Sequence, residues 1–221
     1  MEDKKRTNPA FVILLIAALL AAGVIVYLGF ALDRAEKRAN GYKAAYEALV
    51  EENEARAEDA AAAKRASLQY ENDLREVTYL MLDGGVTAEN CCNRIQSVWY
   101  NCIFELRDAE TDKFTLTESG AFYEDFNDAL DNLFRDKAFV QDCADLQSNR
   151  DDVAARIRNL KNPPDEWRDA YNDLLLYYDA YYDFTDLAIY PQYSLSEFME
   201  FFDDYDGEAL KRFDRMKLYF D

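Results

Sequence analysis

Residues 10–32 read AFVILLIAALLAAGVIVYLGFAL and contain no charged side chain. At about 1.5 Å per residue, a helix of this length reaches about 35 Å, which is enough to cross a hydrocarbon core of about 30 Å. Asn8 and Pro9 suit the start of such a helix, and Tyr27 suits the membrane interface near its far end. The sequence therefore predicts a single transmembrane helix over residues 10–32, with the lipid bilayer as the first expected partner.

The short N-terminal segment 1–9 is basic, so a cleaved signal peptide is the alternative interpretation. The apolar run is longer than the roughly 7 to 15 residues of a signal peptide, and no convincing cleavage site follows it, so we favour an uncleaved anchor. Basic residues lie on both sides of the run, so the positive-inside rule does not decide the orientation. A short basic N-terminus before a long C-terminal body favours a body on the extracytoplasmic side of the cell membrane, with a cytosol-facing body as the alternative.

Composition points to a folded, all-α body. The chain has 25 Lys and Arg against 44 Asp and Glu, a net charge of -19, which would repel the phosphates of nucleic acid. Half of the residues are hydrophobic and 14% are aromatic, which is more than a disordered acidic tail contains. Only 7 Gly and 4 Pro occur, too few for the turns of a protein built from many short strands.

Residues 33–82 continue the anchor as a predicted helical stalk, because they are rich in Ala, Glu, Lys and Arg and contain no Pro. Residues spaced alternately three and four positions apart form one helix face from Tyr42 onward. The residues in the middle of this face are polar or small, which weakens a coiled-coil interpretation. We expect a stalk whose first half projects the body from the membrane and whose second half packs into the bundle, with a homodimer through the stalk as the alternative. Gly84 and Gly85 then predict a helix end, with Thr87 as the cap of the next helix.

Residues 87–221 predict an antiparallel bundle of about five amphipathic helices. The first carries an apolar stripe that includes Cys92, Ile95 and Trp99. The pair Pro163 and Pro164 predicts a hard stop between two helices, and Ser194-x-x-Glu197 predicts a capping box for the last helix. Short connections between long helices are typical of antiparallel bundles.

Catalytic motifs are not apparent. The chain has no histidine, which excludes Ser-His-Asp and Cys-His chemistry, and it has no glycine-rich phosphate loop. The acidic segment 203–208 resembles a calcium loop only superficially, because Phe202 and Phe213 would occupy positions that need oxygen ligands. We therefore predict a non-enzymatic protein with no catalytic, cofactor-binding or metal-binding residues.

The four cysteines are Cys91, Cys92, Cys102 and Cys143. Cys92 and Cys102 would lie about 15 Å apart on one helix and cannot bridge each other. A disulfide from Cys143 to one of the cysteines in the first bundle helix is one alternative, and small buried thiols are the other.

The 16 tyrosines are concentrated toward the C-terminus. Adjacent tyrosines on a helix diverge by about 100°, so one of each pair should face away from the central seam. Tyrosine suits recognition of a protein or glycan partner, although a wide aromatic core stripe explains the pattern as well. The expected partner contacts are Tyr177, Tyr182, Tyr190 and Tyr193.

Several segments carry a resemblance: SVWYN (97–101), TDKFT (111–115), FNDAL (126–130), LKNPP (160–164), YDAY (178–181) and KLY (217–219). Together they resemble a family of uncharacterised bacterial membrane-anchored helical-bundle proteins. The resemblance implies an extracytoplasmic helical body and no assigned activity. We expect an interaction, scaffolding or sensing module, with a bundle that binds a small ligand in an aromatic-lined cavity, or a cytosol-facing membrane scaffold, as alternatives.

Overall fold

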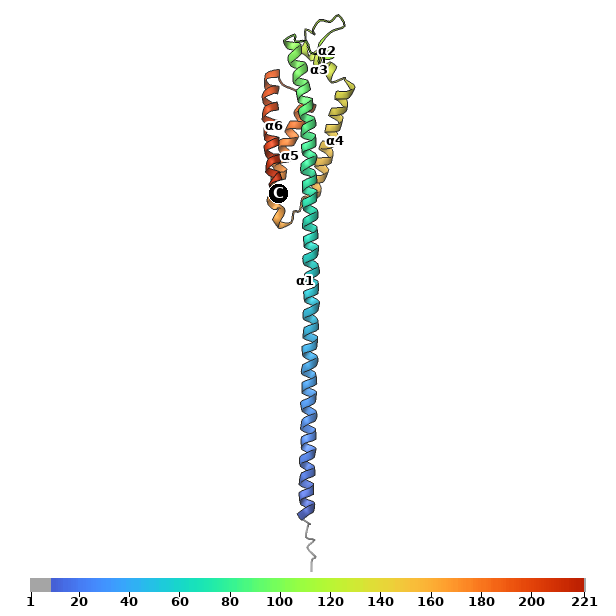
Figure 1. Ribbon diagram of the computed structural model, residues 1–221, viewed down its shortest axis with the longest axis vertical. Coiled ribbons are helices and arrows are strands. Elements are labelled where there is room, and N and C mark those ends of the chain that lie inside the picture. The colour runs from blue at the N-terminus through green and yellow to red at the C-terminus, as the bar shows by residue number, and fades with distance from the viewer. Residues whose placement is uncertain (1–8, 221) are drawn as a thin grey trace, which may run out of the picture. The chain divides into compact units, whose positions relative to one another are not determined.

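The structure is a computed structural model that describes residues 9–220. Its helices are α1 (Pro9–Ile103), α2 (Asp112–Thr115), α3 (Phe126–Leu133), α4 (Lys137–Asn159), the 3-10 helix η1 (Asp165–Trp167), α5 (Arg168–Ile189) and α6 (Leu195–Lys217) (Figure 1). Over residues 9–220 there is no β-strand, only an isolated bridge between Leu116 and Phe122. The predicted all-α class is confirmed. The expected cap at Asn8 and the rest of the N-terminal segment before Pro9 lie outside the described residues.

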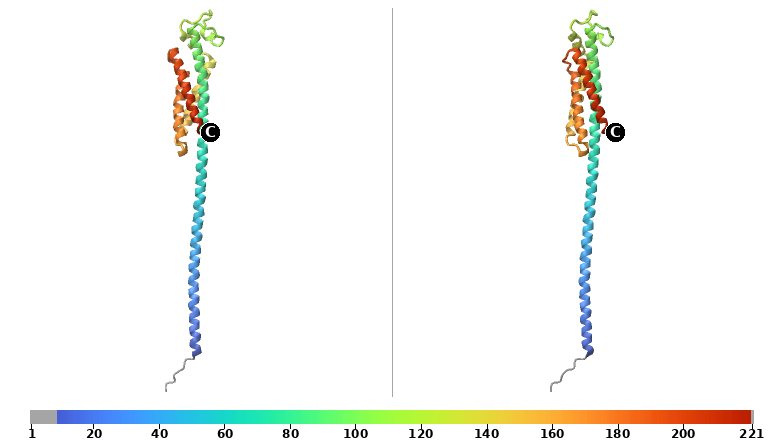
Figure 2. Two further views of the ribbon diagram at one scale, coloured as in Figure 1. Left: turned by 60° about the vertical axis from the view of Figure 1, so that its left-hand side comes forward. Right: turned by 90° about the vertical axis from the view of Figure 1, so that its left-hand side faces the viewer.

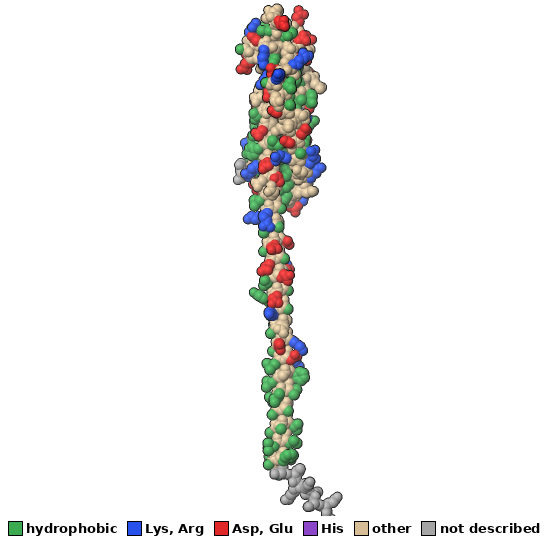
Figure 3. Space-filling view, turned by 90° about the vertical axis from the view of Figure 1, so that its right-hand side faces the viewer, with side chains coloured by type: hydrophobic (Ala, Val, Ile, Leu, Met, Phe, Trp, Pro, Cys, Tyr) green, Lys and Arg blue, Asp and Glu red, His purple; other side chains and the backbone are tan. Residues whose placement is uncertain are grey.

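The chain divides into two compact units, Met1–Ala63 and Lys64–Asp221. In the first unit, α1 begins at Pro9 and every described side chain is exposed. Its apolar window has a mean hydropathy of 3.0 and is not buried at all, unlike the core helix of a soluble protein (Figure 3). This helix is long and apolar enough to cross a membrane, which is compatible with a single-pass anchor.

The second unit is built from the C-terminal part of α1 together with α4, α5 and α6, which pack side by side (Figure 2). Ion pairs show that α4 runs antiparallel to α1, because Arg94 of α1 meets Asp142 of α4, and Arg156 near the end of α4 meets Glu76 of α1. Phe213 of α6 packs on Tyr79 of α1 at 5.6 Å between ring centroids. One continuous core results, and its largest fully buried side chains include Tyr181, Phe139, Phe184, Phe198, Leu74, Met81 and Ile95.

The predicted helix end at Gly84 and Gly85 is wrong, because α1 continues without a break to Ile103. Gly84 is buried where α1 touches its neighbours: a Cβ added there would lie 2.8 Å from the ring of Tyr181 and would also meet the side-chain oxygen of Asn149. A Cβ added at Gly85 would meet nothing within 4 Å. Gly84 therefore serves close packing rather than helix termination.

The other helix boundaries follow local capping chemistry. Ser194 and Glu197 form the expected capping box at the start of α6. Asp125 and Asp136 cap α3 and α4 through their carboxylates, so α3 begins at Phe126. α4 ends at Asn159, just before the predicted Asn162-Pro163-Pro164 stop.

All four cysteines are free thiols in the structure. Cys91, Cys92 and Cys102 are buried, and Cys143 is half-buried. This arrangement matches the buried-thiol alternative.

Candidate functional site

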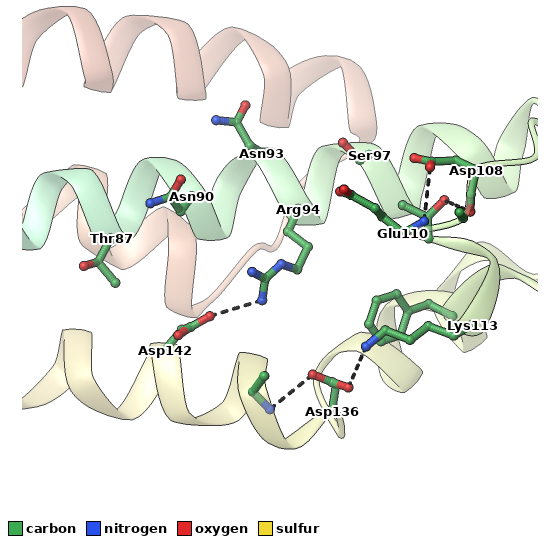
Figure 4. A pocket seen from close by; sticks show the side chains of 14 residues that line it. Thr87, Asn90, Asn93, Arg94, Ser97, Asp108, Glu110, Lys113, Asp136 and Asp142 are labelled. Atoms are coloured by element: carbon green, nitrogen blue, oxygen red, sulfur yellow. Dashed lines mark hydrogen bonds and ion pairs between the residues drawn. The ribbon is translucent and has the colours of Figure 1, made fainter.

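A groove of about 760 Å³ lies between the C-terminal part of α1, the α1–α2 connection with α2, and the start of α4 (Figure 4). Its volume falls within the range of about 300–1,000 Å³ typical of ligand sites, but its lining is mostly polar. Phe114 is its one aromatic lining residue. The groove therefore differs from the aromatic-lined cavity that a small-ligand sensor was expected to contain.

Helix α1 supplies one wall of the groove through a row of polar residues. Members of this row recur every three or four positions, so they lie on one face of the helix. The opposite face carries the buried stripe that includes Cys92, Ile95 and Trp99. Amide, hydroxyl and guanidinium groups thus face the groove from Thr87, Asn90, Asn93, Arg94 and Ser97.

The second wall is a connection held in place by its own hydrogen bonds. Asp112 accepts a hydrogen bond from the backbone N–H of Asp108 at 3.0 Å and forms an ion pair with Arg107 at 2.9 Å. The side-chain amide of Asn101 donates to the Thr111 hydroxyl at 2.9 Å, which ties the connection back to α1. These bonds present Asp108 and Glu110 at the edge of the groove.

Two ion pairs join the walls. Arg94 contacts Asp142 at 3.1 Å, linking α1 to α4, and its guanidinium lies 5.7 Å from the ring centroid of Phe139. Lys113 contacts Asp136 at 3.0 Å, linking α2 to α4. Exposed pairs of this kind contribute at most about 1 kcal/mol each, so a charged ligand can exchange partners with them at low cost.

Asp136 forms an ion pair and also caps α4. Besides pairing with Lys113, it accepts hydrogen bonds from the backbone N–H groups of Ala138 and Phe139 at 3.2 Å each. The hydrogen bond from Lys113, followed by that from the Phe139 N–H, lowers the pKa of this carboxyl below its usual value. The carboxylate form is therefore favoured in the folded protein.

Replacing Asp136 with alanine should lower the free energy of unfolding by about 1–2 kcal/mol at pH 7, because α4 loses its cap. Asp136→Asn keeps a capping oxygen and should cost about 0.5 kcal/mol or less. The pKa of Asp136 is lower in the folded protein than in the unfolded chain. The charge therefore stabilises the fold at pH values above the unfolded pKa of about 3.9, and this stabilisation is lost as the pH falls through the lower folded pKa. Urea unfolding followed by tryptophan fluorescence at pH 7 and about pH 3 measures this. An asparagine variant as unstable as the alanine variant at pH 7 would contradict the capping role.

The tyrosines singled out from the sequence are only partly at the surface. Tyr177 is 2% exposed, so its expected outward position is wrong: its ring packs against Phe213 in the core, and burial raises the pKa of its hydroxyl. Tyr182 is 42% exposed, but its ring lies under the guanidinium of Arg150 at 4.0 Å. Arg150 in turn is buried and pairs with Asp186 at 3.2 Å.

Tyr190 and Tyr193 are exposed and come together at the α5–α6 connection. They line a small pocket of about 180 Å³ with Asp183, Asp186 and Tyr205. Burial, and then the neighbouring Asp179 and Asp186, raise the pKa of the Asp183 carboxyl. Partner contacts through Tyr182, Tyr190 and Tyr193 stay a prediction.

The groove was not predicted from the sequence. The polar face of α1 was visible as the complement of the apolar stripe, and this signal alone could have identified Asn90, Arg94 and Ser97. Neither the hydrogen bonds that fold the α1–α2 connection nor the position of Asp142 can be read from spacing. Within residues 9–220, no group of three or more His, Cys, Asp or Glu side chains could hold a metal ion.

Comparisons with protein-family profiles, with curated proteins and with solved structures found no match for this chain.

Proposed function

We propose that this chain is a membrane-anchored, non-catalytic binding module whose helical body receives a cationic polypeptide segment in the α1–α2–α4 groove. The observation that carries the proposal is the groove itself, an open site of about 760 Å³ with a hydrogen-bonding wall on α1. An open polar groove suits an extended segment that keeps part of its surface in water.

Charge favours a cationic occupant. The lining contains four carboxylates against two cations, Arg94 and Lys113. The whole chain carries a net charge of -19, so its field attracts positively charged partners and speeds their encounter. A lysine or arginine of the partner can pair with Glu110 and Asp108 at the edge of the groove, while its backbone exchanges hydrogen bonds with Asn90.

We further propose that the apolar N-terminal helix anchors the groove at a membrane. The exposed apolar helix over residues 10–32 supports a single span, and the proposal puts the body on the extracytoplasmic side. A C-terminal epitope placed after Asp221 should be removed by protease added to intact cells. An epitope that is protected in intact cells but cleaved after lysis would put the body in the cytosol.

The binding test uses the purified full chain in detergent micelles and two ten-residue peptides, one alternating Lys and Ser and the other alternating Glu and Ser. Titration calorimetry at low salt should detect binding of the Lys-Ser peptide only. Glu110→Lys should weaken that binding about tenfold, because the charge changes inside the groove. Glu200→Lys is the matched control, since Glu200 is exposed on α6 and the net charge changes equally. Equal losses of affinity in both variants would mean that net charge alone attracts the peptide, and would contradict a groove site.

A further inference from the structure

Two of the thiols face each other across the interface of α1 and α4. Cys91 lies on α1 and Cys143 on α4, and the two thiols are close enough for each to shift the pKa of the other. The Arg94–Asp142 ion pair at 3.1 Å joins the same two helices one turn or less from both cysteines. Cys91 is 2% exposed, whereas Cys143 is half-buried and therefore reaches the surface.

The other two cysteines are placed differently. Cys92 is fully buried, and as the neighbour of Cys91 on a helix it points about 100° away. The thiol of Cys102 donates a hydrogen bond to the carbonyl of Tyr123 at 3.6 Å. Among the described cysteines, Cys91 and Cys143 are therefore the two that lie next to each other.

We propose that Cys91 and Cys143 form a reversible disulfide that joins α1 to α4 beside the polar groove. Asn90 and Arg94 flank Cys91, and Asp142 precedes Cys143, so the bond would tie together two walls of the groove. Antiparallel helices already packed through small side chains need little movement to bring two sulfurs into bonding distance. The inference stands on the Arg94–Asp142 ion pair, which brings the two cysteines together, and does not depend on what the groove binds.

The oxidant is a second disulfide, either a small-molecule disulfide or that of a thiol–disulfide oxidoreductase. The Cys143 thiolate attacks one sulfur of this disulfide, forms a mixed disulfide and releases one thiolate. Cys91 then loses its proton to solvent and attacks the Cys143 sulfur, which releases the second thiolate. Overall, two protein thiols lose two protons and two electrons, and the external disulfide is reduced to two thiols.

The local environment assigns these roles. The interaction with Cys91 lowers the pKa of Cys143, and the nearby Arg94 acts in the same direction, so the more accessible sulfur is the better nucleophile. The interaction with Cys143 and burial raise the pKa of Cys91, which keeps it protonated until the mixed disulfide forms. An attacking thiolate and a protected second thiol are what a stepwise exchange requires.

The test treats the purified full chain, in detergent micelles, with oxidised glutathione, then blocks free thiols and digests with trypsin. Oxidation should join peptide 76–94 to peptide 138–150, with a loss of two hydrogens in mass and a fall from four free thiols to two. Peptide 76–94 contains both Cys91 and Cys92, so variants are needed to separate them.

Cys91→Ala and Cys143→Ala should abolish the joined peptides, whereas Cys92→Ala and Cys102→Ala should keep them. Because there are two control variants, Cys92→Ala and Cys102→Ala, the test still stands if one of them fails to fold. Tryptophan fluorescence reports whether each variant is folded. Reduction with dithiothreitol should restore four thiols. Absence of the joined peptides in the oxidised wild-type chain, or their persistence in Cys91→Ala, would overturn the proposal.

Discussion

Replacing Gly84 with alanine should lower the free energy of unfolding of the helical body by about 2–3 kcal/mol. The added methyl group would lie 2.8 Å from a ring carbon and 2.9 Å from the hydroxyl of Tyr181, and it would also meet the side-chain oxygen of Asn149. Tyr181 donates a hydrogen bond to that oxygen, and the Asn149 amide donates to the carbonyl of Leu80 at 3.1 Å. Space for the methyl group therefore requires three helices to shift or this hydrogen-bonded chain to break.

Gly85→Ala is the matched control. Its Cβ meets nothing within 4 Å, and alanine favours the interior of a helix over glycine by about 0.5–1 kcal/mol, so this variant should be slightly more stable. Urea unfolding followed by tryptophan fluorescence reports on the body, because both tryptophans, Trp99 and Trp167, lie in the unit Lys64–Asp221. Equal effects of the two substitutions would show that the close approach at Gly84 does not constrain packing.

Phe198→Ala should be more damaging still, with a loss of about 3–5 kcal/mol. Phe198 is fully buried on α6, with its ring 5.9 Å from Trp99 of α1 and 6.4 Å from Phe202. Truncation leaves a cavity between α6 and α1 that their backbones cannot close. The loss of contact should also shift the fluorescence of Trp99 in the folded state.

Phe201 supplies the comparison for this prediction, as the same residue type on the same helix. It is only partly buried and contacts Tyr193 and Tyr205 at ring distances of 4.5 and 5.7 Å. Phe201→Ala should therefore lower stability by about 1 kcal/mol, because less apolar surface is lost from the core. Similar losses for both variants would contradict the deeper burial of Phe198 in the core.

Local signals in the sequence predicted much of the fold. The capping box at Ser194 and the prolines after Asn162 work through chemistry between near neighbours, so they can be read without tertiary structure. The helix end predicted at Gly84 and Gly85 was wrong, because glycine ends many helices but also allows close helix packing. Only the positions of Asn149 and Tyr181 distinguish the two uses at Gly84.

The candidate site was harder to predict than the fold. Tyr177 and Tyr178 are adjacent, and the sequence indicates that their rings diverge but not which of them enters the core. The structure buries Tyr177 against Phe213 of α6, a partner 36 positions away in sequence. The groove depends on long-range placement in the same way, because Asp142 meets Arg94 only when α4 packs along α1.

The position of α1 in the core also sets an order of events during synthesis. Its buried residues, from Leu74 to Cys102, leave the ribosome before α4, α5 and α6 exist. At ordinary rates of translation, α6 follows on the order of ten seconds later. During this interval Trp99 has no Phe198 to pack against, so the nascent chain exposes an apolar helix face. We expect chains that stop before Leu195 to be held by chaperones or degraded, whereas completion of α6 covers this face and ends the exposure.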